Sequence, residues 1–228
     1  MTPAQPLRRA GSVTEPRPLR ITEVFCSLQG EGLSVGRPTV FVRLTGCPLR
    51  CRYCDTAYAF TGGTVWQPDE LMAAVAGYGV AHVTVTGGEP LAQPGCSALV
   101  EHLCDAGYRV SVETSGALDI GGIDRRASRV VDFKTPSSGE FGRNHWENVA
   151  HLGENDQVKF VVGDRADYEW ARDWMLEQGL PGRCEVLFSP VHETLAPRTL
   201  ADWMVADRLP ARFQIQLHKL LWGEEPGR

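Results

Sequence analysis

The sequence of 228 residues lacks any long apolar run and any excess of basic charge. No stretch approaches the roughly 20 consecutive apolar residues of a membrane-spanning helix, so we expect no membrane association. A protein that follows a nucleic-acid backbone usually carries a basic excess, whereas the formal net charge here is -5, so we expect no nucleic-acid partner. With 43% hydrophobic and 22% charged residues, the composition excludes a collagen, a coiled coil and a disordered chain.

The N-terminal segment lacks the apolar centre of a secretory signal peptide. Residues 1–20 hold four arginines and four prolines, and we predict a flexible leader there. A transit-like segment is the alternative, which its weak amphipathicity disfavours. Residues 21–228 are expected to form a single domain that is long enough to bury a core. Because the seven cysteines are odd in number and no signal peptide precedes them, we expect a cytoplasmic protein without a disulfide framework.

Short runs rich in β-branched and aromatic residues alternate with helical patterns along the chain. The predicted strands cover residues 39–45, 80–86, 109–114, 129–134, 156–162, 185–189 and 213–218. The predicted helices cover residues 68–78, 97–106, 164–178 and 198–209. This alternation predicts an α/β fold with a mainly parallel sheet. Functional groups then gather at the carboxyl ends of the strands, which share one mouth.

Three closely spaced cysteines follow the predicted strand 39–45. Cys47, Cys51 and Cys54 form a CxxxCxxC pattern in a Gly/Pro loop. Soft thiolates favour an iron–sulfur cluster or zinc. A structural zinc site commonly takes four ligands in two paired arms, and the sequence offers no second arm. Three thiolates on a four-iron cluster would leave one iron open to a small molecule. The remaining isolated cysteines of the later segments are expected to be buried as small apolar side chains: Cys96, Cys104 and Cys184.

The cysteine pattern, with Tyr53 just before its third member, resembles that of the radical S-adenosylmethionine enzymes. Their second pattern is matched by Gly87-Gly88-Glu89-Pro90, which follows the predicted strand 80–86. The resemblance implies a partial, reduced (β/α) barrel with one 4Fe-4S cluster on the three cysteines. It also implies that S-adenosylmethionine binds the open iron and yields a 5′-deoxyadenosyl radical, which takes a hydrogen atom from the substrate. Further strand-end segments, at 113–116, 132–134 and 157–159, resemble cofactor contacts of the family.

The residues expected to contact S-adenosylmethionine are Tyr53, Asp55, Gly88, Glu89, Thr114, Ser115, Asp132, Lys134 and Gln157.

Both ends of the chain resemble the 7-carboxy-7-deazaguanine synthase family within that superfamily. Residues 21–32 (ITEVFCSLQGEG) match its opening, and residues 216–222 (QLHKLLW) match its ending. The resemblance implies conversion of 6-carboxy-5,6,7,8-tetrahydropterin to 7-carboxy-7-deazaguanine and ammonia by a magnesium-dependent radical ring contraction, a step towards queuosine. S-adenosylmethionine would be regenerated. The family further implies an electron donor such as flavodoxin or ferredoxin, and a homodimer.

The resemblance also implies a role for individual side chains. The Gln29 amide and the Glu31 carboxylate match the donors and acceptors on the edge of a pterin. The Arg43 guanidinium can hold the substrate carboxylate in a bidentate pair, and the Thr56 hydroxyl can be one of the few protein ligands of Mg²⁺. No side chain is expected to be catalytic, because the cofactors supply the difficult chemistry. The full set of implied substrate contacts is Leu28, Gln29, Gly30, Glu31, Arg43, Thr86 and His218.

Two other functions stay open at this point. A glycyl-radical-enzyme activase of the same superfamily would share the cysteine and Gly-Gly-Glu-Pro patterns, but would act on a protein and would not explain residues 29–32 together with the ending. A non-enzymatic metal-binding module would need neither Gly88 nor Glu89 and would not cleave S-adenosylmethionine. Taken singly, residues 29–32 read as a polar turn. The joint match of distant segments is what favours the pterin enzyme.

Overall fold

The structure is a computed structural model that describes residues 17–223, 225 and 227. Its strands are β1 (Leu19–Leu28), β2 (Pro38–Leu44), β3 (Thr64–Trp66), β4 (His82–Gly87), β5 (Arg109–Thr114), β6 (Ser128–Asp132), β7 (Gln157–Val162), β8 (Glu185–Pro190) and β9 (Arg212–Phe213). Its α-helices are α1 (Pro68–Gly77), α2 (Cys96–Asp105), α3 (Arg165–Glu177), α4 (Pro197–Asp207) and α5 (Leu217–Trp222). Short 3-10 helices are η1 (Ala57–Phe60), η2 (Pro90–Ala92), η3 (Pro136–Ser138), η4 (Phe141–Arg143), η5 (Trp146–His151) and η6 (Leu180–Gly182).

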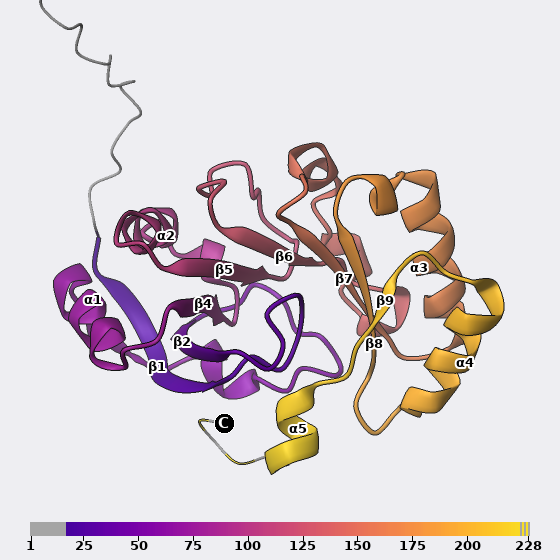
Figure 1. Ribbon diagram of the computed structural model, residues 1–228, viewed down its shortest axis with the longest axis horizontal. Helices are drawn as coiled ribbons and strands as arrows, with labels where there is room; N and C mark the ends of the chain where they lie inside the picture. Colours follow the sequence, from indigo (N-terminus) through magenta and orange to yellow (C-terminus); the bar gives the residue numbers. More distant parts are fainter. Residues whose placement is uncertain (1–16, 224, 226, 228) are drawn as a thin grey trace, which may run out of the picture.

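The described strands form one curved sheet in the order β3-β1-β2-β4-β5-β6-β7-β8-β9. Neighbours from β2 to β9 run parallel, whereas β1 is antiparallel to both β2 and β3. Helices α1 to α4 cover the outer face (Figure 1). Because β3 and β9 are edges and do not pair with each other, the sheet is an open, partial barrel. The predicted α/β class with mainly parallel strands is therefore confirmed.

The predicted elements agree with the structure except near the two ends. Strands β1 and β3 are additional to those expected. The strand expected over 213–218 is wrong after Phe213, because the chain leaves the sheet edge there and Leu217 and His218 begin α5. Strand β1 begins at Leu19, so the last two residues of the expected leader belong to the sheet. The rest of that leader, residues 1–16, lies outside the described residues.

Period-two alternation along the strands separates an apolar outer face from a polar inner face. On β4, Val83 and Val85 join the buried apolar cluster beneath the helices, whereas Thr84 and Thr86 alternate with them. The Thr84 hydroxyl lies 2.8 Å from that of Ser111 on β5. The inside of the barrel is therefore lined with polar groups, which is where a polar substrate could be held.

The isolated cysteines pack in the outer core as expected. Cys96 and Cys184 are buried members of the apolar cluster, and Cys104 packs against it partly buried. None of the helices in the described part of the chain combines the length and the apolar character that crossing a membrane requires.

Candidate active site

Two adjoining cavities occupy the inside of the barrel. The first, of about 670 Å³, is lined by Cys47, Cys51 and Cys54, and we call it the cysteine cavity. The second, of about 660 Å³, is lined by Gln29 and Arg43 among others, and we call it the Gln29 cavity. The two cavities adjoin, because side chains from distant elements line both: Glu31, Asp55, Thr56, Thr86, Glu113, Lys159, Gln216 and Lys219.

The cysteine loop is held by the turn that follows β4. Gly88 N donates to Leu44 O at 3.1 Å, and Glu89 N donates to Gly46 O at 2.8 Å. A Cβ on Gly88 would lie 2.4 Å from Gly46 O, closer than any real side chain can approach. Gly88 is thus required for this contact, in agreement with the close approach that glycine allows. The turn fixes where the cysteine loop leaves β2.

The three cysteines of this loop are partly exposed thiols that face one cavity. Burial raises the pKa of Cys47, and it raises that of Cys51 to about 11 although the Lys134 ammonium opposes the shift. Within the described residues, no three metal-ligating side chains converge on a point fit for a single ion. All three thiols line the cysteine cavity, and thiolates are the donors that an iron–sulfur cluster takes.

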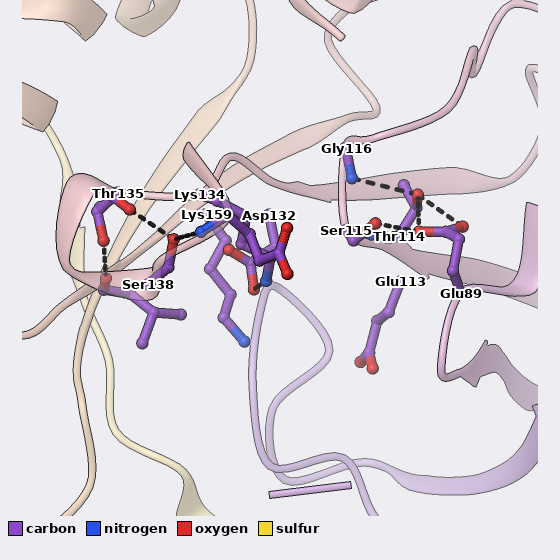
Figure 2. Close-up of polar contacts among 12 residues, drawn as sticks. Glu89, Glu113, Thr114, Ser115, Gly116, Asp132, Lys134, Thr135, Ser138 and Lys159 are labelled. Carbon is purple, nitrogen blue, oxygen red and sulfur yellow. Dashed lines mark hydrogen bonds and ion pairs between the residues drawn. The ribbon is translucent and has the colours of Figure 1, made fainter. Parts of the chain in front are cut away.

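The Glu89 carboxylate meets Thr114 and Ser115 (Figure 2). This carboxylate is fully buried and accepts hydrogen bonds from Thr114 Oγ1 at 2.9 Å, Ser115 N at 2.7 Å, Ser115 Oγ and Leu91 N at 2.9 Å. Thr114 and Ser115 line the cysteine cavity, whereas Glu89 lines neither cavity. In this arrangement Glu89 orients the two hydroxyl residues through direct hydrogen bonds.

Asp132 and Lys134 form an ion pair beside the cysteines, with Lys134 Nζ 2.9 Å from Asp132 Oδ2. Burial works against the charge of Lys134, but Asp132 and the neighbouring acidic groups raise its pKa above the usual range. Asp132 Oδ1 and the Tyr53 hydroxyl are buried without a hydrogen-bond partner among the described residues. Both side chains line the cysteine cavity, so they offer unused polar atoms to a ligand there.

The loop after β1 enters the barrel through Gln29 and Glu31. Gln29 Nε2 donates to Thr84 Oγ1 and to Glu113 Oε1, each at 3.1 Å. Glu31 forms an ion pair with Lys159 of β7, and its Oε1 is buried without a partner in the described part of the chain. Gln29 is therefore engaged by its own chain, while Glu31 keeps an acceptor for a ligand.

Glu113 and Lys159 are site residues to which the sequence patterns assign no contact of their own. Figure 2 shows both side chains extending in the same direction from β5 and β7. Thr86 Oγ1 donates to Glu113 Oε2 at 3.0 Å. Burial, together with the charge of Glu31, raises the pKa of Glu113. The period of β5 and β7 is the signal that could have identified them, because it points both residues inwards.

Arg43 and Glu23 form the opposite wall of the Gln29 cavity. Arg43 Nε lies 2.7 Å from Glu23 Oε1, which also accepts from the Tyr58 hydroxyl at 2.8 Å. The Nη groups of Arg43 make no hydrogen bond with the described residues, so a bidentate face remains for a carboxylate. Leu28 lines the same cavity.

Gln157 is not brought to either cavity, although it is an expected cofactor contact. It lies at the start of β7, away from the carboxyl ends of the strands, and is buried. Its Oε1 accepts from Leu33 N at 2.8 Å, and its Nε2 donates to Ser128 Oγ at 2.9 Å. Its observed contacts shape the loop after β1.

The C-terminal helix α5 lies between the β1–β2 side and the β8–β9 side of the open sheet (Figure 1). Leu217 N donates to Gly30 O at 3.1 Å, and His218 lines the Gln29 cavity. A Cβ on Gly30 would lie 2.3 Å from His218 Nδ1, so only glycine lets the ring pack there. Burial lowers the pKa of His218. The loop after β1 and helix α5 thus meet around the Gln29 cavity.

The open parallel barrel, with three cysteines in the loop after β2, is the fold of the radical S-adenosylmethionine superfamily, and residues 41–134 match the model of the Radical SAM superfamily. A 7-carboxy-7-deazaguanine synthase from Chlorobaculum tepidum is 44% identical over 211 residues, which cover 91% of this chain and 96% of that protein. A second from Koribacter versatilis is 40% identical and covers 91% and 98%. The chain belongs to the 7-carboxy-7-deazaguanine synthase family.

Solved structures agree on the fold. The crystal structure of QueE from Escherichia coli matches with a TM-score of 0.68 at 23% identity, covering 88% of this chain and 95% of that one. Streptococcus suis SuiB bound to S-adenosylmethionine matches with a TM-score of 0.50 at 13% identity, covering 75% of this chain and 44% of that one. The chain is therefore an enzyme of the radical S-adenosylmethionine type by relationship and by fold.

Proposed function

We propose that the chain converts 6-carboxy-5,6,7,8-tetrahydropterin to 7-carboxy-7-deazaguanine and ammonia in a magnesium-dependent reaction on the route to queuosine. The observation that carries this proposal is that the two cavities adjoin and share lining residues. A substrate in the Gln29 cavity would lie directly beside a cofactor in the cysteine cavity, with Thr86 and Glu113 in the shared wall. Radical transfer between two bound molecules needs such a juxtaposition.

The cysteine cavity is the proposed site of one 4Fe-4S cluster and S-adenosylmethionine. Cys47, Cys51 and Cys54 would hold the cluster as thiolates, which requires loss of the protons that burial now favours. When bound, the two groups supply hydrogen-atom abstraction from the substrate. The chain itself contributes orientation of polar cofactor groups through Asp132 and the Glu89-anchored Thr114 and Ser115.

The Gln29 cavity is the proposed substrate site. The free Oε1 of Glu31 can accept hydrogen bonds from the 2-amino edge of a pterin. Gln29 would contact the ring only by exchanging one of its present hydrogen bonds, and it otherwise positions Glu113. The unbonded Nη groups of Arg43 suit the substrate carboxylate. Leu28 and His218 would enclose the ring, and Gly30 would leave room for the His218 imidazole.

The proposed Mg²⁺ ligand is the hydroxyl of Thr56, which lines both cavities. Magnesium typically keeps several waters and takes few protein ligands, so one hydroxyl together with substrate oxygens is a plausible set. A cation at this position would also offset the negative charge of a substrate carboxylate.

The wider setting is proposed from the family. We propose an electron donor such as flavodoxin or ferredoxin, a homodimer, and a cytoplasmic location; the seven free cysteines are compatible with a reducing compartment. Residues 21–228 are proposed as one domain, supported by the single sheet that runs from β3 to β9. No nucleic-acid or membrane partner is proposed.

The test is an anaerobic assay with the reconstituted protein, S-adenosylmethionine, a reductant, Mg²⁺ and 6-carboxytetrahydropterin, followed by mass spectrometry. We expect 7-carboxy-7-deazaguanine, with S-adenosylmethionine not consumed in proportion. Slow 5′-deoxyadenosine formation with an untouched pterin would contradict the assignment and favour an activase. No cleavage of S-adenosylmethionine would favour a metal-binding module.

A further inference from the structure

One carboxylate, that of Asp55, joins the cysteine loop to the C-terminal helix. Asp55 follows Cys54 directly, and its Oδ2 accepts from Gln216 Nε2 at 3.0 Å. Lys219 Nζ of α5 lies 3.3 Å from the same Oδ2. These contacts span more than 160 residues of sequence. Asp55, Gln216 and Lys219 all line both cavities, so the connection lies at the junction of the cofactor and substrate sites.

The other oxygen of the same carboxylate orients a hydroxyl. Thr56 Oγ1 donates to Asp55 Oδ1 at 2.8 Å. A hydroxyl has one hydrogen and two lone pairs. Because the hydrogen of Thr56 is directed at Asp55, both lone pairs remain for another partner, which is the state that a hydroxyl needs in order to bind a cation. Residues that orient metal ligands in this way strongly influence metal affinity.

Helix α5 is also attached to the loop after β1, which lines the proposed substrate site. Leu217 N donates to Gly30 O, and the His218 ring packs against Gly30. Without the Asp55 contacts, fewer bonds would hold the six-residue α5 to the barrel. Packing would compensate little, because Leu220 and Leu221 of this helix are exposed. Asp55 is therefore one of the groups that hold α5, and with it His218, at the Gln29 cavity.

We propose that Asp55 is a positioning residue that couples the placement of α5 at the substrate cavity to presentation of the Thr56 hydroxyl for a divalent cation. This assigns Asp55 a role different from the direct S-adenosylmethionine contact expected from the sequence. The proposal rests on the proposed function for the identity of the substrate and of the cation. The contacts within the chain do not depend on that function.

The experiment compares Asp55→Ala and Gln216→Ala with the unmodified enzyme, all with the cluster and S-adenosylmethionine bound and without reductant, so that no turnover occurs. Asp202→Ala is the matched control, because Asp202 is an exposed carboxylate on α4 whose ion pair with Arg198 is distant at 3.7 Å. Iron content per chain verifies that the cysteine loop is intact. Two readouts are taken: amide hydrogen exchange over residues 214–223, and 6-carboxytetrahydropterin affinity as a function of Mg²⁺ concentration.

We expect faster exchange of α5 in both variants, and weaker pterin binding. In Asp55→Ala the Mg²⁺ concentration for half-maximal pterin binding should rise about tenfold or more, the effect typical of losing a residue that orients a metal ligand. In Gln216→Ala that concentration should rise less, since the Asp55–Thr56 bond remains. Asp202→Ala should change neither readout.

Unchanged exchange of α5 in both variants would overturn the proposal, as would a Mg²⁺ requirement that Asp55→Ala leaves unaltered. If Asp55→Ala assembles no cluster, Gln216→Ala decides through exchange and pterin affinity, because Gln216 lies outside the cysteine loop. Failure of the unmodified enzyme to bind the pterin would instead contradict the proposed function. In that case the α5 exchange rates of the ligand-free variants still support or overturn the link through Asp55.

Discussion

Lys159 of β7 forms a partly buried ion pair with Glu31 of the loop after β1, and this pair spans the inside of the barrel between residues 128 positions apart. The Lys159 ammonium keeps its charge although burial disfavours it, since Glu31 and Asp132 raise its pKa above the usual range. The pair holds the carboxylate that we propose for pterin recognition. The loop after β1 therefore depends on the far side of the sheet for its position.

Breaking this pair should lower both the free energy of unfolding and the affinity for the substrate. Lys159→Met keeps most of the side-chain volume but leaves the partly buried Glu31 carboxylate without its partner, so the free energy of unfolding should fall by about 2 kcal/mol, between the values for exposed and fully buried pairs. Denaturant unfolding measures this change. Arg198→Met, which removes the exposed pair with Asp202, should change stability little. Equal effects of the two substitutions would show that the Lys159–Glu31 pair has no special role.

Gly88→Ala should disturb the cysteine loop. The new Cβ would lie 2.4 Å from Gly46 O and 2.8 Å from Cys47 Cβ, and backbone must move to relieve that overlap. Overpacking of this kind costs about 1–3 kcal/mol. We expect less iron per chain after reconstitution, measured by metal analysis and absorbance. Gly122→Ala, where a Cβ meets nothing within 4 Å, is the matched control. Full iron loading in Gly88→Ala would contradict the anchoring role.

Thr56→Ala should weaken the binding of magnesium more than the binding of S-adenosylmethionine. The substitution removes the hydroxyl that lies at the junction of the two cavities but leaves the cysteines untouched. Product formation is to be titrated with Mg²⁺, and S-adenosylmethionine affinity is to be measured separately. Thr56→Ser keeps the hydroxyl and should restore the requirement. Loss of cluster assembly in Thr56→Ala would mean that our magnesium assignment is wrong.

Protonation of His218 should make the enzyme less stable at mildly acidic pH. Burial lowers its pKa below the ordinary value of 6.5, so the unfolded chain binds a proton more readily than the folded chain in the window below pH 6.5. The stability that the neutral ring contributes is therefore present above that window and is lost as the pH falls through it. His218→Gln should reduce the slope of unfolding free energy against pH between pH 5 and 6.5, about the range in which a histidine titrates. An unaltered slope would exclude this contribution.

Local patterns were sufficient for most of the strands and helices. The alternation of valines on β4 and β5, and the Asp164 side chain that accepts from Asp167 N at the start of α3, are signals contained in short segments. The strand predicted over residues 213–218 was wrong because this segment lies at a sheet edge, where no further strand of the described residues pairs with it. There the contact with Gly30 holds a helix instead.

The sequence by itself determined the cysteine spacing, the Gly-Gly-Glu-Pro turn and the matching segments at both ends, because those depend on residue type and order along the chain. The tertiary structure alone decided that Glu89 supports Thr114 and Ser115 from behind, that Gln157 lies away from the cavities, and that Asp55 meets Gln216. The physical reason is that a side chain's partners in a barrel come from strands and loops distant in sequence. Packing and charge pairing across the interior determine which of these strands and loops supply the partners.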